Sequence, residues 1–213
     1  MKVIKCPDRK NCKKCDLKEK ELDEIIATLR GGDLVVFPTD TLYGIGADPF
    51  NENSVKKVFI AKNRPFDMPL SIAVSNEKMM ESVAVLNDPA RKLIRKFFPG
   101  PLTIMLTKKP SIPDILTAGS NQVGIRIPDH PLAIRLIDRF GPITATSANL
   151  HSHPDPVEAG LPQKDLKGHI QICIDCGKTK YNAPSTIVDV SDGTVELIRK
   201  GVISQEQIQD ALR

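Results

Sequence analysis

Leu34-Val35-Val36-Phe37-Pro38-Thr39-Asp40-Thr41 is the stretch that decides the fold class. Its first four residues form an unbroken apolar run between a Gly-Gly-Asp segment and Pro38, which predicts a short strand buried on both faces. Upstream, apolar side chains recur at helical spacing over residues 21–30, so a helix is predicted there, and Gly31-Gly32 ends it. A helix followed by such a strand is typical of an α/β sheet covered by helices.

The same alternation continues along the chain. Helices are predicted over residues 55–61, 90–98 and 131–140, and a capping box at Ser204 and Gln207 predicts a terminal helix. Strands are predicted at 70–74, 102–106, 123–127, 143–146, 170–174, 185–190 and 195–198, and Asp192-Gly193 is a hairpin turn between the last two. We therefore expect one α/β domain, built on a twisted sheet of mixed direction with helices on both faces, and ligands bound beyond the strand ends.

Composition indicates a soluble globular protein. The 213 residues are 40% hydrophobic and 26% charged, which is enough for a substantial core. No apolar run approaches the roughly 18 residues of a membrane span, and the N-terminus lacks the apolar stretch of a signal peptide. We expect a cytoplasmic protein without membrane contact.

Positive charge is concentrated at the N-terminus. Residues 1–20 carry eight Lys or Arg and three acidic residues, whereas the whole chain has a net charge of +4. We therefore divide the chain into a basic, cysteine-containing arm over residues 1–20 and a domain over residues 21–213. Such an arm is usually a solvated terminus, and contact with nucleic acid is the alternative.

Polar clusters at the predicted strand ends supply candidate site residues. Lys62 and Arg64 follow a helix and precede Pro65, so both side chains can extend from one loop and bind an anion such as a triphosphate. Ser147 and Asn149 follow a buried strand and can donate hydrogen bonds to phosphate or carboxylate oxygens. The alternative for Lys62 and Arg64 is that they only complement the dipole of the helix C-terminus. The alternative for Ser147 and Asn149 is a plain turn without a binding role. The chain has neither a P-loop nor a GxGxxG motif.

Together with five ordered blocks of sequence, these clusters resemble the YrdC family over about residues 21–199. The blocks are residues 36–44, 61–65, 99–103, 123–128 and 185–187. The resemblance implies an α/β fold with a concave basic surface, in its short form without a further C-terminal domain. It also implies a nucleotidyltransferase that makes threonylcarbamoyl-adenylate from L-threonine, bicarbonate and ATP with Mg²⁺, releasing pyrophosphate. The product would serve the threonylcarbamoyladenosine modification of tRNA.

The resemblance also assigns roles to single residues. The ATP-binding set is Lys62, Arg64, Ser147, Asn149 and Arg199. Lys62 and Arg64 are its catalytic pair, because nucleotidyl transfer needs positioning and stabilised charge more than a side-chain nucleophile. The threonine-binding set is Thr39, Arg126 and Ser185.

Arg126 is the most informative residue of the threonine-binding set. Its guanidinium, at the end of an apolar strand, is suited to a planar carboxylate. An ordinary ion pair with Asp129 or Asp138 is the alternative.

Three positions depart from the family pattern and leave other functions open. Pro184 stands where an acid often precedes Ser-Thr, Ala73 where His is frequent, and Lys200 where proline usually follows the arginine. The alternatives are a paralogue without threonine-dependent activity and a module that binds structured RNA by shape. For the synthase, we expect a threonylcarbamoyl-transferase to accept the labile product, and tRNA or double-stranded RNA is a candidate partner.

The cysteines form two C-x-x-C pairs that suggest a zinc site. The candidate ligands are Cys12, Cys15, Cys173 and Cys176, with Cys6 left over. Against zinc, residues three apart in a strand point to opposite faces, and we expect reduced thiols instead. Residues 151–167 are predicted to form a long loop or lid, with His151 and His153 in solvent.

Overall fold

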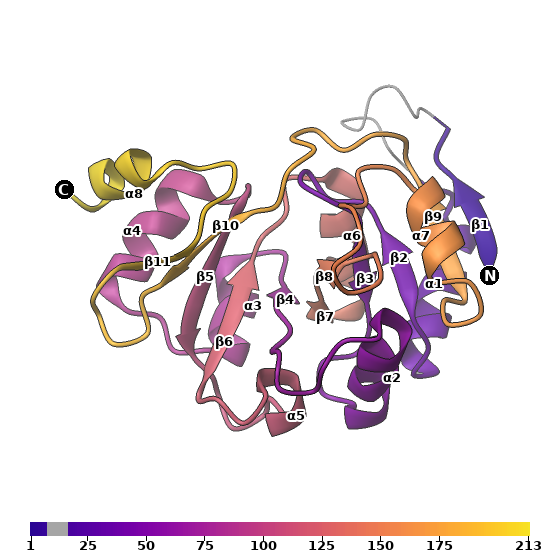
Figure 1. Cartoon of the computed structure of the whole chain (residues 1–213), viewed down its shortest axis with the longest axis horizontal. Coiled ribbons are helices and arrows are strands. Elements are labelled where there is room, and N and C mark those ends of the chain that lie inside the picture. The colour runs from indigo at the N-terminus through magenta and orange to yellow at the C-terminus, as the bar shows by residue number, and fades with distance from the viewer. Residues whose placement is uncertain (8–16) are drawn as a thin grey trace.

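The computed structural model describes residues 1–7 and 17–213. The described strands form two mixed sheets that lie side by side (Figure 1). The first sheet contains, in order, β1 (Lys2–Lys5), β9 (Ile172–Asp175), β2 (Val35–Phe37), β3 (Gly44–Gly46) and β8 (Thr146–Ser147). The second contains β11 (Glu196–Arg199), β10 (Thr186–Asp189), β5 (Leu102–Thr107), β6 (Gln122–Arg126), β4 (Ile72–Ala73) and β7 (Ile143–Thr144).

The α/β class and the mixed strand direction are confirmed, but the strands do not form the single sheet that was predicted. β2 pairs parallel with β9 and antiparallel with β3, and β5 pairs parallel with β10 and antiparallel with β6. The predicted strand at 143–146 is split: β7 joins the second sheet and β8 the first, with Ala145 between them. Local sequence predicts strands but does not identify their distant partners, so this division was missed.

Helices cover the sheets: the five that the sequence predicts are present, and three further described helices were not predicted. α1 (Glu19–Arg30) buries Leu22, Ile25, Ile26 and Leu29, and it packs against α6 (Pro131–Phe140). The other described helices are α2 (Glu52–Lys62), α3 (Glu77–Val83), α4 (Asp88–Phe97), α5 (Asp114–Thr117), α7 (Gly160–Asp165) and α8 (Gln205–Leu212). α7 lies within the predicted loop at 151–167, and α8 begins with the predicted capping box at Ser204 and Gln207. Of the helices in the described ranges, none has the length and apolar character needed to cross a bilayer.

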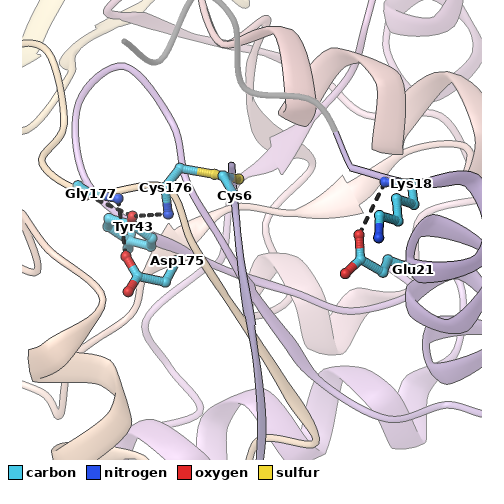
Figure 2. The surroundings of a disulfide bond; sticks show 7 residues. All are labelled: Cys6, Lys18, Glu21, Tyr43, Asp175, Cys176 and Gly177. Carbon is cyan, nitrogen blue, oxygen red and sulfur yellow. Dashed lines mark hydrogen bonds between the residues drawn. A yellow bond between two sulfur atoms is a disulfide. The ribbon is translucent and has the colours of Figure 1, made fainter. Parts of the chain in front are cut away.

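The predicted basic arm contributes a strand to the domain. β1 pairs parallel with β9, so that Lys5 lies opposite Asp175. The next residues in the register, Cys6 and Cys176, form a disulfide with their Cα atoms 5.0 Å apart (Figure 2). Our expectation that the cysteines are reduced is therefore wrong for this pair, because the edge strand that brings them together was not predicted. The domain boundary at residue 20 stays a prediction.

Candidate functional site

A cleft lies between the two sheets and is lined by residues from both. Thr39, Thr41, Tyr43 and Ser147 come from the first sheet and its loops. Ala73, Thr103, Arg126, Ser185 and Arg199 come from the second sheet and its loops, and Arg64 follows α2. Among the described residues that line the cleft, the charged side chains are three arginines and one acid, Asp155. The predicted concave basic surface is therefore this cleft.

The structure brings most of the predicted site residues to this one cleft. Those that line it are Thr39, Arg64, Arg126, Ser147, Ser185 and Arg199. Lys62 and Asn149 are buried next to it and are not among the described lining residues. Sequence reasoning missed Thr41, Thr103 and Asp155, although the first two lie within the blocks that carry the family resemblance.

Lys62 is the last residue of α2 and supports the turn that carries Ser147 and Asn149. Its side chain is only 2% exposed. Its ammonium donates to the carbonyl oxygens of Ser147 and Asn149, the latter at 2.8 Å, and to Asn149 Oδ1 at 3.1 Å. Nζ also lies 3.5 Å from Ser147 Oγ, so acceptors of this one turn surround the ammonium. Lys62 therefore holds the turn in this structure, whereas the sequence had suggested that it extends into the site.

Burial controls the charge of Lys62. Loss of hydration lowers its pKa from 10.5 to about 7, and the nearby Arg64 charge adds to this effect. In the unfolded chain the side chain regains its ordinary pKa. Between pH 7 and pH 10 the unfolded state therefore binds more protons at this position than the folded state does.

The free energy of unfolding should consequently rise with pH through Lys62. We expect wild type to gain about 2 kcal/mol relative to Lys62→Met between pH 7 and pH 9. Denaturant unfolding at a series of pH values measures this difference. Lys56→Met changes an exposed lysine of the same helix, 3.8 Å from Glu52, and should follow the wild-type pH dependence. Parallel curves for wild type and Lys62→Met would contradict the lowered pKa.

Arg64 and Ser147 are the members of the Lys-x-Arg and Ser-x-Asn pairs that reach the cleft. Arg64 donates from Nε and Nη2 to the carbonyl oxygens of Met68 and Pro69, each at 3.1 Å, and it is half-buried. Ser147 Oγ donates to Asn149 Oδ1 at 2.7 Å. These contacts hold both side chains at the cleft wall, where Arg64 retains further N–H groups that can bind an anion.

Asn149 stabilises the loop that follows the turn. Its amide nitrogen donates to the carbonyl oxygens of His153 and Pro154, at 2.8 and 3.1 Å. The predicted solvent position of His153 is confirmed, since its side chain is 49% exposed, although it lies 3.1 Å from Asp165.

Arg126, at the end of β6, lies at the junction between the sheets. Its ion-pair partner is Asp40, at 2.6 Å, and neither Asp129 nor Asp138, the two partners that the sequence suggested, forms an ion pair with it among the described residues. The guanidinium also donates to Thr41 Oγ1 at 2.5 Å and to the Gly100 carbonyl oxygen at 3.2 Å. Asp129 instead pairs with Lys180 at 2.8 Å.

Ser185 and Arg199 connect the two predicted binding sets. Arg199 donates to the Ser185 carbonyl oxygen at 2.7 Å and to its Oγ at 3.2 Å. Ser185 Oγ also lies 2.8 Å from Thr103 Oγ1. Thr39 is held on the other side of the cleft, where its hydroxyl donates to the Leu42 carbonyl oxygen at 2.7 Å. Residues of the two predicted sets therefore lie in one cleft, and the bonds between Arg199 and Ser185 join the sets.

The predicted zinc ligands are only partly within the described residues. Cys12 and Cys15 lie outside them. Cys173, on β9 of the first sheet, packs in the core cluster that residues of both sheets share, where burial raises the pKa of its thiol to about 12. Cys176 packs in the other core cluster, beside Cys6. Strand alternation thus separates Cys173 from Cys176, and the disulfide to Cys6 removes the Cys176 thiolate that zinc would need. Cys173 and Cys176 therefore do not form the predicted half of a zinc site in this structure.

Comparison with known proteins identifies the family of the chain that forms this cleft. Residues 27–201 match the protein-family model Sua5_yciO_yrdC, which carries the description Telomere recombination. The chain belongs to the Sua5/YciO/YrdC family. A Methanocaldococcus jannaschii relative is 42% identical over 197 residues, which cover 91% of this chain and 93% of the relative.

Longer members of the Sua5/YciO/YrdC family contain the same unit as a part. The threonylcarbamoyl-AMP synthase of Bacillus subtilis is 39% identical over 194 residues, covering 90% of this chain and 56% of that protein. The crystal structure of Pyrococcus abyssi Sua5 complexed with L-threonine has a TM-score of 0.92 and 34% identity, and it covers 100% of this chain and 61% of that chain. The chain therefore spans about three fifths of these longer relatives and nearly all of the M. jannaschii protein.

Proposed function

We propose that this chain joins L-threonine, bicarbonate and ATP into threonylcarbamoyl-adenylate and releases pyrophosphate, for the modification of tRNA. The observation that carries the proposal is the cleft in which Arg64, Arg126 and Arg199 converge from different parts of the fold. Its support is membership of a family that includes threonylcarbamoyl-AMP synthases of comparable sequence. Three cations in one cleft suit a triphosphate and a carboxylate bound side by side.

At the ATP end, the chain would act through charge and position. The threonine amine attacks bicarbonate to form a carbamate with loss of water, and a carbamate oxygen attacks the α-phosphorus as the bond to pyrophosphate breaks. Arg64, Arg199 and Ser147 would bind the phosphates and stabilise the developing negative charge. Lys62 and Asn149 would act through the turn that they hold. Mg²⁺ enters with ATP as part of the substrate.

At the threonine end, Arg126 would bind the carboxylate. Thr39 would contact the hydroxyl or amine from the opposite wall, and Ser185 would close the pocket between the two ends. Ala73 and Pro184, two of the three departures from the family pattern, both line this cleft. They would shape the pocket by volume, since neither side chain has a polar group to offer.

Two further features of the function follow from the chemistry of the product. A mixed carbamic–phosphoric anhydride is labile, so we propose direct transfer to a threonylcarbamoyl-transferase that acts on tRNA. The cluster of basic residues at positions 1–20 is the candidate contact for tRNA or double-stranded RNA.

Threonine-dependent pyrophosphate release tests the proposed activity. We expect release from ATP and bicarbonate only when L-threonine is present, and its loss in Arg64→Ala and Arg126→Ala. Arg95→Ala, which removes an exposed arginine on α4, should keep wild-type rates. Release without threonine dependence would favour the paralogue. Strong RNA affinity without ATP turnover would favour the RNA-binding module.

A further inference from the structure

Asp40 is a buried carboxylate at the point where the two sheets meet. It follows β2 of the first sheet, yet its ion-pair partner Arg126 ends β6 of the second. Asp40 is only 1% exposed, and Arg126 is 6% exposed. A buried charge is costly unless it is paired, so each of these residues requires the other.

The contact between the two charged groups uses one atom of each. Asp40 Oδ1 accepts from Arg126 Nη2 at 2.6 Å and from the Asp129 backbone N–H at 3.1 Å. Asp40 Oδ2 and Arg126 Nε are both buried, and among the described residues neither has a hydrogen-bond partner. A guanidinium can form two parallel bonds to a carboxylate, and this one does not do so with Asp40. Thr41 takes one N–H of Nη1, and Asp40 and Gly100 take both of Nη2, so the guanidinium retains Nε–H and one N–H of Nη1 for a second carboxylate.

The positions of Asp40 and Arg126 relative to the cleft show from which side a ligand can reach the guanidinium. Arg126 lines the cleft, whereas Asp40 is not among the described residues that line it. Asp40 thus contacts the guanidinium from the protein interior. Thr41 and the Gly100 carbonyl oxygen hold the Arg126 guanidinium at two further points, so its orientation is fixed before any ligand binds.

We propose that Asp40 is a positioning residue that makes the cleft selective for an amino acid with a free carboxylate. It holds Arg126 from behind and leaves the remaining guanidinium donors for the substrate. The proposal rests on the proposed function only in naming L-threonine as that amino acid. A site built on such a charge-assisted pair rejects a ligand that lacks the matching group far more strongly than an apolar pocket does.

A comparison of L-threonine with L-threoninamide tests this selectivity, because the amide replaces the carboxylate and keeps the side chain and amine. Binding is measured by calorimetry and turnover by pyrophosphate release. We expect wild type to bind L-threonine at least about 10-fold more tightly than the amide. In Asp40→Asn, which keeps the shape but removes the charge, this preference should fall by about 10-fold while ATP affinity stays within about twofold.

Two more variants make the result specific. Asp129→Asn removes a nearby charge that pairs with Lys180 and not with Arg126, so it should keep the wild-type preference. Thr41→Val removes the other side-chain contact of Arg126 without changing any charge, and it should lower the preference several-fold. Thr41→Val decides the question if Asp40→Asn does not fold.

Each outcome either supports or overturns the proposal. Equal losses of L-threonine and amide affinity in Asp40→Asn would show a structural role only and would overturn it. An unchanged preference in that variant, or no preference in wild type, would overturn it too. Wild type that binds L-threonine selectively but releases no pyrophosphate would refute the proposed function and leave the role of Asp40 standing.

Discussion

Replacing Lys62 by alanine should abolish threonine-dependent pyrophosphate release and also destabilise the fold. The ammonium is the shared donor to the Ser147 and Asn149 carbonyl oxygens and to Asn149 Oδ1. Its removal leaves buried acceptors without that donor and opens a cavity where the stem packed. We expect the free energy of unfolding to fall by about 2–4 kcal/mol at pH 8.

Arg64→Ala separates loss of activity from loss of stability. Arg64 is half-buried and bonds only to carbonyl oxygens of its own loop among the contacts that the structure describes, so its loss should cost less than about 1 kcal/mol. We expect activity to disappear in both variants and stability to fall only in Lys62→Ala. Lys56→Ala should change neither. If Lys62→Ala unfolds at the wild-type denaturant concentration yet is inactive, Lys62 acts on the nucleotide directly, as the family resemblance implied.

Gly201→Ala should distort the cleft, although Gly201 is not among the described residues that line it. A Cβ at Gly201 would lie 2.4 Å from the Thr186 backbone nitrogen and 2.5 Å from the Pro184 carbonyl oxygen. Neither of these backbone atoms can rotate away as a side chain can. The segment that carries Ser185 must therefore shift, and the bonds from Arg199 to Ser185 shift with it. We expect a loss of about 3 kcal/mol in the free energy of unfolding, together with most of the activity.

Thermal unfolding and pyrophosphate release measure the two effects of Gly201→Ala. For a chain of this size the expected destabilisation lowers Tm by about 6–12 °C. Gly160→Ala is the matched control, because among the described residues no atom lies within 4 Å of the added Cβ. A Gly201→Ala protein with wild-type Tm and activity would show that this segment can move without consequence for the site.

Sequence reasoning succeeded where local pattern decides the structure. The buried strand at 35–37, the helix before it and the hairpin between β10 and β11 are all present. Each depends only on neighbouring residues: on the periodicity of apolar side chains, on glycines that end a helix, or on residues that favour a hairpin turn. The candidate site was also assembled from polar residues at strand ends, which a sheet brings to one edge.

The features that sequence reasoning missed depend on distant parts of the chain. Asp40 and Arg126 are 86 residues apart, and nothing in either local sequence shows that they pair. The burial of Lys62 follows from the turn at 147–149, which encloses an ammonium that its own helix would leave in solvent. β1 was missed because four residues of an edge strand carry too little periodicity to be distinguished from an extended arm.

The one-residue connection between β7 and β8 restricts how the cleft can change its width. Ala145 joins the two sheets directly, and its N–H donates to the Ser71 carbonyl oxygen at 2.8 Å. Ala145 also lines the cleft, so the two sheets are joined at the cleft wall itself. A one-residue connection keeps β7 and β8 at a fixed separation, so a change in the width of the cleft would require rotation about Ala145 and not separation of the sheets there. Such a rotation would move the rims of the cleft that are far from Ala145 more than the wall beside it.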